Sequence, residues 1–319
     1  MAISRRGFLF TTVAVIFVTA IVIYVSAQER IYPRTLSQTN RVLVMDAYLE
    51  NLEEDLPRAA YIACFRSLIA MEEYIATTGT FTTDFDGMFT SLFTNGTING
   101  TAYGIMNQSS FVDFTQRFST IAARQGMSAN LTVLAVNASQ SDPWFVDLVA
   151  TVHIQLRDTA TSVSWNRTVQ ITSRVPITDI KDPLYSVGTQ GRAPHVVRQG
   201  NITPPYVGAG NDTTPLQQIL NNSWYIATSV APSFLQRFSG DLSSDPNGIM
   251  SFVDVTELRA QDIIVDSCKS VADYVFFGPA NSDPNKYLAG MDPNIFWLDD
   301  GTIAAIGAGG AVSGSAPCP

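Results

Sequence analysis

Residues 7–26 read GFLFTTVAVIFVTAIVIYVS, a run of twenty residues without a charge that follows directly on Arg5 and Arg6. An α-helix rises about 1.5 Å per residue, so a helix of this length spans about 30 Å, the thickness of the hydrocarbon core of a bilayer. The run predicts a transmembrane helix over residues 8–27. The two arginines predict that the N-terminus is cytoplasmic and that everything from Gln28 onward is extracellular.

The composition suits an exported protein with a sizeable folded part. The chain has 319 residues, and 46% of them are apolar, which is enough for a substantial core. Only 15% are charged, well below the roughly 25% of an average soluble domain, and Thr, Ser, Asn and Gln take their place. The net charge of −9 argues against a nucleic-acid partner, because phosphate binding needs clustered Lys and Arg. We therefore expect membrane lipid, and no nucleic acid, as a partner.

Sequons for N-linked glycans lie on one side of the apolar run. Nine Asn-x-Ser/Thr sequons follow it and none precedes it. An Asn- and Thr-rich chain makes some sequons by chance, but this one-sided placement favours a glycosylated extracellular region. The candidate glycosylation sites are Asn95, Asn99, Asn107, Asn130, Asn137, Asn166, Asn201, Asn211 and Asn221.

The N-terminus allows three interpretations. A secretory signal would be cleaved before Gln28, and a twin-arginine signal would use the stretch Ser4-Arg5-Arg6-Gly7-Phe8-Leu9. Both predict a soluble secreted product, but the apolar run is longer than the roughly 7–15 residues of a usual signal core. In the third interpretation the helix is retained. Arg-Arg-Gly followed at once by an apolar helix resembles the class III signal of type IV pilin precursors, especially archaeal ones.

That resemblance implies how the N-terminus is processed and used. A membrane prepilin peptidase would cut after Gly7, so that residues 1–7 are a leader. The retained helix would anchor the subunit in the membrane and then pack with other pilin-like subunits as the core of a filament. Thr12 stands where bacterial pilins carry Glu, a departure that is tolerable for an archaeal subunit. The processing residues are then Arg5, Arg6, Gly7 and Phe8.

An amphipathic stem helix is predicted over residues 36–78. We expect a break or kink at Pro33 and a restart of the helix at Pro57, because proline disrupts a helix interior but is tolerated in a first turn. The predicted apolar face comprises Leu49, Leu52, Leu56, Ala59, Ala60 and Ala63, at spacings of three and four. A solvated acidic face is predicted for Asp46, Glu50, Glu53 and Asp55. Residues 46–75, with the later runs Asp182-Pro183-Leu184-Tyr185 and Ala231-Pro232-Ser233-Phe234-Leu235, resemble uncharacterised archaeal pilin-like membrane proteins.

The rest of the chain predicts an α+β head with antiparallel sheet and short helices. We divide it into a first lobe at 79–185, a loop or linker at 186–215 and a second lobe at 216–319. In the first lobe we expect a helix at 110–125, strands at 130–136, 144–156 and 162–175, and a hairpin turn at 157–161. The middle strand is expected to alternate through Phe145, Val149, Val152 and Ile154. In the second lobe we expect helices at 216–221 and 232–238, a helical turn at 257–261, and strands at 224–229, 250–255, 272–277 and 303–310.

No constellation of residues points to catalysis, so we expect neither an enzyme nor a cofactor. The chain lacks the G-x-S-x-G elbow of the α/β-hydrolases. We expect His153 to pack within a strand and His195 to lie in solvent.

The sequence contains one candidate metal-binding pattern and one candidate disulfide. Asp245, Asn247 and the distal Asp254 partly fit a calcium loop, although an Asp-Pro-Asn-Gly turn explains the same residues without metal. Cys268 and Cys318 are the preferred disulfide pair in an extracellular chain, and Cys64 is expected to be a buried thiol.

The leading hypothesis is a structural surface protein, a minor or tip pilin-like subunit of an archaeal type IV pilus-like filament. An anchored extracellular binding or adhesion protein that never polymerises is the first alternative. A secreted protein with a cleaved signal is the second.

Overall fold

A computed structural model of the chain describes residues 5–278 and 285–316; within the first helix it describes side chains for residues 15–26 and from residue 39 onward. The described elements are helices and small antiparallel sheets, which confirms the α+β class. They fall into two compact units. The first unit comprises Met1–Asp55, Phe118–Leu131 and Ile154–Arg167, and the second comprises Leu56–Arg117, Thr132–His153 and Thr168–Pro319.

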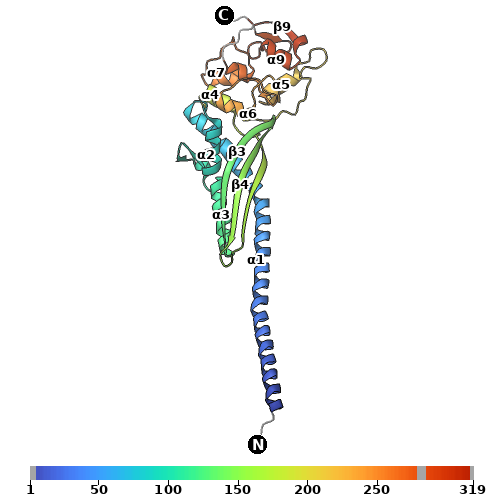
Figure 1. Cartoon of the computed structure of the whole chain (residues 1–319). Coiled ribbons are helices and arrows are strands. Elements are labelled where there is room, and N and C mark those ends of the chain that lie inside the picture. Colours follow the sequence, from blue (N-terminus) through green and yellow to red (C-terminus); the bar gives the residue numbers. More distant parts are fainter. Residues whose placement is uncertain (1–4, 279–284, 317–319) are drawn as a thin grey trace. The chain divides into compact units, whose positions relative to one another are not determined.

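Helix α1 (Arg5–Thr78) is one continuous helix, drawn in blue to cyan in Figure 1. It continues through Pro33 and Pro57, so it neither breaks at Pro33 nor restarts at Pro57, and that part of the prediction is wrong. A proline inside a helix costs about 3 kcal/mol. In the second unit, Leu56 and Leu68 of α1 are fully buried, and each buried leucine contributes roughly 1.5–3 kcal/mol, which together outweighs the cost of Pro57.

The predicted apolar face of α1 is confirmed: Leu49, Leu52, Leu56, Ala59, Ala60 and Ala63 are all buried. Of the predicted acidic face, Asp46, Glu50 and Asp55 are exposed, whereas Glu53 is half-buried. Where side chains are described, no helix has an apolar stretch long enough to cross a bilayer. The predicted transmembrane segment at 8–27 includes residues 8–14 and 27, whose side chains lie outside the described part.

The first unit is tied together by polar contacts between α1 and the segments that belong to it. Arg41 Nη2 lies 2.6 Å from Asp158 Oδ1, and Tyr48 Oη donates to the carbonyl of Phe118 at 2.7 Å. The backbone N–H of Asp158 donates to the carbonyl of Val163 across the predicted hairpin turn, which is confirmed. Arg41 thus links the stem to a hairpin more than a hundred residues away.

A three-stranded sheet with the order β3-β4-β5 matches the predicted strands. Its strands are β3 (Met127–Asp142), β4 (Phe145–Asp158) and β5 (Ser164–Pro176), and α3 (Phe111–Arg124) is the predicted helix before them. The buried residues of β4 are Val146, Leu148, Ala150, Val152, Ile154, Leu156 and Asp158. Phe145 and Val149, predicted on the same face as Val152, are instead half-exposed, because alternate residues of a strand point to opposite faces.

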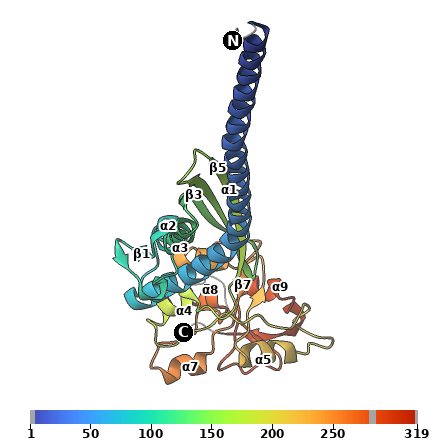
Figure 2. The same ribbon diagram turned by 90° about the horizontal axis from the view of Figure 1, so that it is seen from below.

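Helix α2 (Phe85–Asn95) and the two-residue strands β1 (Thr97–Ile98) and β2 (Thr101–Ala102) follow α1 in the second unit, with the single turn η1 (Gly104–Met106) after them. The side chain of Asp84 caps α2 by accepting from the N–H of Gly87 at 2.9 Å, and Gly96 ends it in the left-handed conformation with φ 70°. β1 lies beside α2 in Figure 2. The β1–β2 turn is Asn99-Gly100, both with positive φ, as the tightest hairpins require.

The C-terminal part of the second unit is built from very short elements joined by irregular loops (Figure 1). They are α4 (Pro183–Gly188), α5 (Thr214–Asn221), β6 (Ile226–Ala227), α6 (Phe234–Ser239), β7 (Ile249–Met250), α7 (Val255–Ala260), α8 (Asp273–Phe276), β8 (Lys286–Leu288), α9 (Asp300–Ala305), η2 (Gly309–Ala311) and β9 (Val312–Ser315).

Two predicted strands of this part are wrong. Residues 272–277 form α8, and residues 303–310 contain the end of α9 and most of η2. Asp299 explains the second error, because its side chain caps α9 by accepting from the N–H of Thr302 at 2.9 Å. The predicted strands at 224–229 and 250–255 shrink to the two-residue strands β6 and β7, which pair antiparallel.

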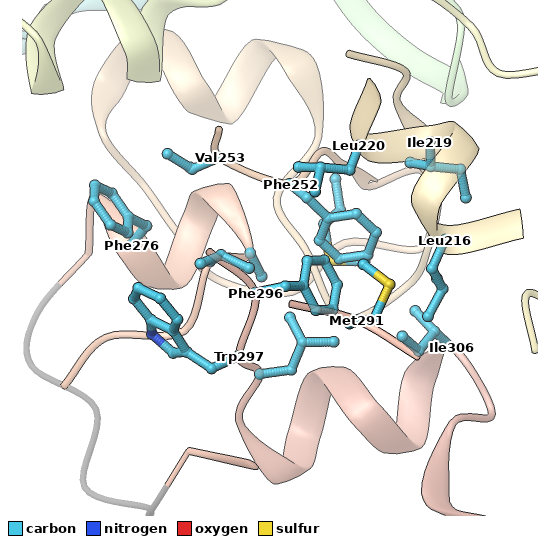
Figure 3. Close-up of a cluster of buried hydrophobic side chains, with 14 of the residues drawn as sticks. Leu216, Ile219, Leu220, Phe252, Val253, Phe276, Met291, Phe296, Trp297 and Ile306 are labelled. Atoms are coloured by element: carbon cyan, nitrogen blue, oxygen red, sulfur yellow. The ribbon is translucent and has the colours of Figure 1, made fainter. Parts of the chain in front are cut away.

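An apolar core holds these short elements together (Figure 3). At its centre the rings of Phe252 and Phe296 meet edge to face, with centroids 5.0 Å apart. Around them Figure 3 places Leu216, Ile219, Leu220, Met291 and Ile306, from helices and loops alike. This part is therefore held together mainly by apolar side chains that many loops and short helices bury in a common core, and not by a regular sheet.

Candidate functional site: a buried polar centre

A group of three charged side chains is completely buried in the second unit. The guanidinium of Arg237 lies between two carboxylates, with Nη1 at 2.5 Å from Asp182 Oδ2 and 2.9 Å from Asp273 Oδ2. All three side chains have an exposed fraction of 0%. Nη2 of Arg237 also donates to the carbonyl of Ile249 in β7. We call Arg237, Asp182 and Asp273, with the groups bonded to them below, the polar centre.

Local capping interactions position the three charged residues. Asp182 is the N-cap of α4, and its Oδ1 accepts from the N–H of Leu184 at 2.8 Å, which leaves Oδ2 for Arg237. Arg237 is carried by α6, whose first turn is fixed by a capping box between Ser233 and Gln236. Asp273 is the first residue of α8. Each charge is thus held by the end of a short helix.

Two hydrogen-bond branches leave the charged core and approach each other again. In one, Tyr225 Oη donates to Asp182 Oδ2 at 2.7 Å, so that the neutral His195 donates from Nδ1 to Tyr225 Oη at 2.8 Å. In the other, Ser251 Oγ donates to Asp273 Oδ2 at 2.9 Å and therefore accepts from Tyr185 Oη at 3.0 Å. The rings of Tyr185 and His195 stack with centroids 4.3 Å apart, which closes the circuit.

The environment shifts the ionisation of these groups strongly. Burial opposes the charge on Arg237, but Asp182 and Asp273 outweigh it and raise the pKa of the guanidinium above its ordinary value. Burial lowers the pKa of His195 to about 4, so this imidazole is neutral at pH 7. Burial likewise raises the pKa of Tyr185 and Tyr225 well above the ordinary value. At neutral pH the centre therefore holds one guanidinium, and both of its tyrosines are protonated.

This arrangement is suited to holding loops together. Arg237, Tyr225, Asp182 and Asp273 have side chains without contact to solvent, so no substrate reaches their reactive atoms in this conformation. Removing one partner of a buried ion pair typically costs about 3–5 kcal/mol, because the other charge is left buried and uncompensated. The polar centre thus joins α4, α6, α8 and β7 in one geometry.

The two histidines differ from the sequence prediction. His195 was expected in solvent but has an exposed fraction of 9% and belongs to the polar centre. His153 lies in β4 as predicted, but on its half-exposed face, where Nδ1 is 3.1 Å from Thr168 Oγ1. The Pro- and Gly-rich sequence around His195 predicts a solvated loop. The hydrogen-bond partner Tyr225 lies thirty residues further along the chain, so no local pattern indicates that His195 is buried.

The calcium candidates are used in turns and caps. Asp245 Oδ1 accepts from the N–H of Asn247 and the carbonyl of Asp245 accepts from Gly248, which is the turn expected without metal. Asp254 caps α7 by accepting from Thr256 and Glu257. Among the side chains that the structure describes, no group of three or more His, Cys, Asp or Glu is placed to hold a metal ion.

The remaining sequence candidates are placed only in part. Cys64 is fully buried, as predicted, and burial raises the pKa of its thiol to about 12. Cys268 is half-buried, whereas Cys318 lies outside the described residues, so their pairing stays a prediction. The side chains of the processing residues Arg5, Arg6, Gly7 and Phe8 also lie outside the described part. All nine sequon asparagines are exposed.

Three surface pockets lie next to α2 in the second unit. One of them has a volume of about 520 Å³ and lies between the end of α1, residues 80–84 and α2. We call it the Asn99 pocket, because Asn99 is part of its wall. A second, of about 540 Å³, is lined by Asn95 and by residues 133–136 of β3. A third, of about 350 Å³, is lined by Asn95 and Asn107. Each pocket therefore has at least one sequon asparagine in its wall.

Comparison of the chain with protein-family models, with curated proteins and with solved structures found no match.

A buried carboxylate joins α1 to α4 within the second unit and gives a testable pH dependence. Glu72 has an exposed fraction of 3%, and its Oε1 accepts from Ser186 Oγ at 2.7 Å. Burial raises the pKa of Glu72, although the bond from Ser186 and the charge of Lys181 both act to lower it. A raised carboxyl pKa contributes stability that is complete below the ordinary value, near 4.3, and is lost as the pH rises through the raised value.

We expect Glu72→Gln to stabilise the protein, with a gain that grows as the pH rises from 4 to 8. The amide oxygen of glutamine still accepts from Ser186, while the cost of burying a charge is removed. Thermal unfolding midpoints at pH 4, 6 and 8 measure the effect. Glu50→Gln, at an exposed position of the same helix, is the matched control and should show no such trend. A Glu72→Gln protein that is less stable than the natural one at pH 8 would contradict this prediction.

Proposed function

We propose that this chain is a pilin-like surface protein, a subunit whose N-terminal helix is retained after removal of residues 1–7 and packs in lipid or against other subunits. The observation that carries the proposal is the apolar run of residues 7–26 directly after Arg5-Arg6-Gly7. Its orientation in the membrane follows from the two arginines, which keep the leader in the cytoplasm.

The described part of that run supports the proposal. From Val15 to Val25 the large apolar side chains have exposed fractions of 48–68%, with Phe17 the most exposed at 68%. Later in α1, Leu52, Leu56 and Leu68 are completely or almost completely buried. Apolar surface in water is unfavourable by roughly 25 cal/mol per Å², so residues 15–25 need a cover that lipid or a copy of the same helix supplies.

A role in display rather than catalysis fits the rest of the chain. The largest buried cluster of charges in the described residues fixes loops and offers no exposed charged atom to a substrate. The nine exposed sequons, all beyond the apolar run, favour an extracellular, glycosylated head. The partners of this proposal are membrane lipid, other pilin-like subunits and a prepilin peptidase.

We expect the mature protein to begin at Phe8. Mass spectrometry of the N-terminal peptide, on protein extracted from the membrane or filament fraction of the natural host, measures this directly. Gly7→Val should leave the leader attached, because the larger side chain disturbs the cleavage position. Ala20→Val, a change of similar size inside the apolar run, should be processed normally and is the control.

The other outcomes separate the alternatives. An N-terminus at Gln28 would contradict the proposal and indicate a cleaved secretory signal. An intact Met1 would leave an anchored binding or adhesion protein that does not polymerise.

A further inference from the structure

The Asn99 pocket has the lining of a carbohydrate site. Its volume of about 520 Å³ falls within the roughly 300–1,000 Å³ of ordinary small-molecule sites. Hydroxyl and aromatic side chains share its wall: Tyr74, Phe81, Thr80, Thr82, Thr83 and Ser91. Hydroxyl groups donate and accept hydrogen bonds, and aromatic rings pack against C–H surfaces, which together match a polyhydroxylated sugar ring.

The charged residues in the wall of the Asn99 pocket restrict the chemical class of its ligand further. Asp84 is the one charged residue in the wall of this pocket, and its Oδ1 already accepts from the N–H of Gly87. The wall contains no Lys or Arg that would attract an anionic group. A neutral, hydroxyl-rich ligand therefore fits this pocket better than a phosphate or a carboxylate.

Asn99 holds such a ligand at the edge of the pocket if its sequon is glycosylated. The residue is exposed, and it occupies the first position of the tight turn between β1 and β2 with φ 51°. Pairing of Ile98 with Thr101 fixes this turn, and Gly100 follows with φ 78°. A sugar attached here enters the pocket without the entropy loss of free association, because the covalent link sets a high effective concentration.

We propose that the glycan on Asn99 folds back into the Asn99 pocket and binds between the end of α1 and α2. This inference rests on the glycosylated, extracellular head of the proposed function, and goes beyond it by assigning a ligand and a binding site. The attached sugars then tie Tyr74 of α1 to Ser91 of α2 across the pocket. Their loss loosens the start of α2, whose cap at Asp84 lies in the same wall.

The test compares full-length protein from the natural host with three variants. Asn99→Gln removes the glycan and the asparagine, whereas Thr101→Ala removes the sequon but leaves the Asn99-Gly100 turn intact. Asn221→Gln, at an exposed sequon at the end of α5, is the matched control. Glycopeptide mass spectrometry measures occupancy of Asn99, and hydrogen exchange measures the protection of the backbone amides of residues 85–95.

We expect Asn99 to be occupied, and exchange in α2 to become about fivefold faster or more in both Asn99→Gln and Thr101→Ala, but not in Asn221→Gln. An unoccupied Asn99 overturns the inference, and so does unchanged exchange in an occupied protein. Faster exchange in Asn99→Gln alone also overturns it, because the effect would then belong to the asparagine side chain. An equal effect in Asn221→Gln would point to a general effect of glycans and likewise overturn it. The N-terminus, read in the same preparations, reports on the proposed function separately.

Discussion

Arg237→Met is expected to lower the free energy of unfolding by about 3–5 kcal/mol. The variant removes the positive charge between Asp182 and Asp273 and leaves both carboxylates buried with no cation between them. Methionine has a similar length and an apolar side chain, so the loss reflects the charge and its hydrogen bonds more than the volume. The midpoint of urea unfolding of the full-length protein, followed by tyrosine and tryptophan fluorescence, measures the change.

A matched variant separates this effect from a general loss of arginine. Arg167→Met breaks the pair between Arg167 Nη1 and Glu53 Oε1, which are 2.8 Å apart, but the side chain of Arg167 is 63% exposed. An exposed pair contributes less than about 1 kcal/mol, so this control should unfold close to the natural protein. Equal destabilisation by the two variants would contradict the role given to the polar centre. Adding Asp182→Asn and Asp273→Asn to Arg237→Met should recover part of the loss, because the uncompensated charges disappear.

The second large effect is a loss of stability in acid that depends on His195. Its pKa is lowered to about 4 by burial, with Arg198 and Arg237 acting in the same direction and Asp273 against them. The unfolded chain, in which the pKa is near 6.5, therefore binds the proton first as the pH falls. The stabilisation is complete above pH 6.5 and is lost as the pH falls toward 4. At about 1.4 kcal/mol per pKa unit, the loss amounts to about 3 kcal/mol.

His195→Gln should remove this part of the pH dependence. Glutamine keeps a donor for Tyr225 but does not titrate, so the difference in unfolding free energy between the natural protein and the variant should shrink by about 3 kcal/mol from pH 7 to pH 4. Using the difference cancels the carboxylates that titrate in the same range. His153→Gln, at the half-exposed histidine of β4, should leave the profile unchanged. A constant difference between His195→Gln and the natural protein across this range would show that His195 titrates normally.

Long periodic elements could be predicted from the sequence, and short ones could not. A regular spacing of apolar residues persists over ten or more residues in α1, in α3 and in the three long strands. Over such a length this spacing predicts the type of element more strongly than the propensities of single residues. The segment Ala272–Phe277 was predicted as a strand, yet it forms α8, whose first residue is bound to an arginine 36 residues away. No local pattern encodes such a partner.

Local sequence patterns do not predict the polar centre for the same reason, although the sequence carries one signal of it. Arg237 lies three residues after Phe234, the spacing that places two residues on one face of a helix, and both Phe234 and the neighbouring Phe238 are fully buried. A basic residue on an apolar helix face calls for a buried acidic partner. The sequence cannot say which of its many aspartates is that partner, because Asp182 and Asp273 lie 55 and 36 residues from Arg237 in opposite directions.

Those separations also set the order in which the chain can fold. Arg237 joins segments that begin at Asp182 and end at Asp273, so a nascent chain that has emerged as far as residue 272 still carries an arginine with only one of its two carboxylates. Closing loops of this length is slow, and an incomplete centre leaves apolar surface such as Phe234 and Phe238 open to aggregation. The second unit is therefore expected to fold late, after residue 273 has been synthesised and has left the ribosome. Until then α1, with its many local contacts, is the part that can already be helical.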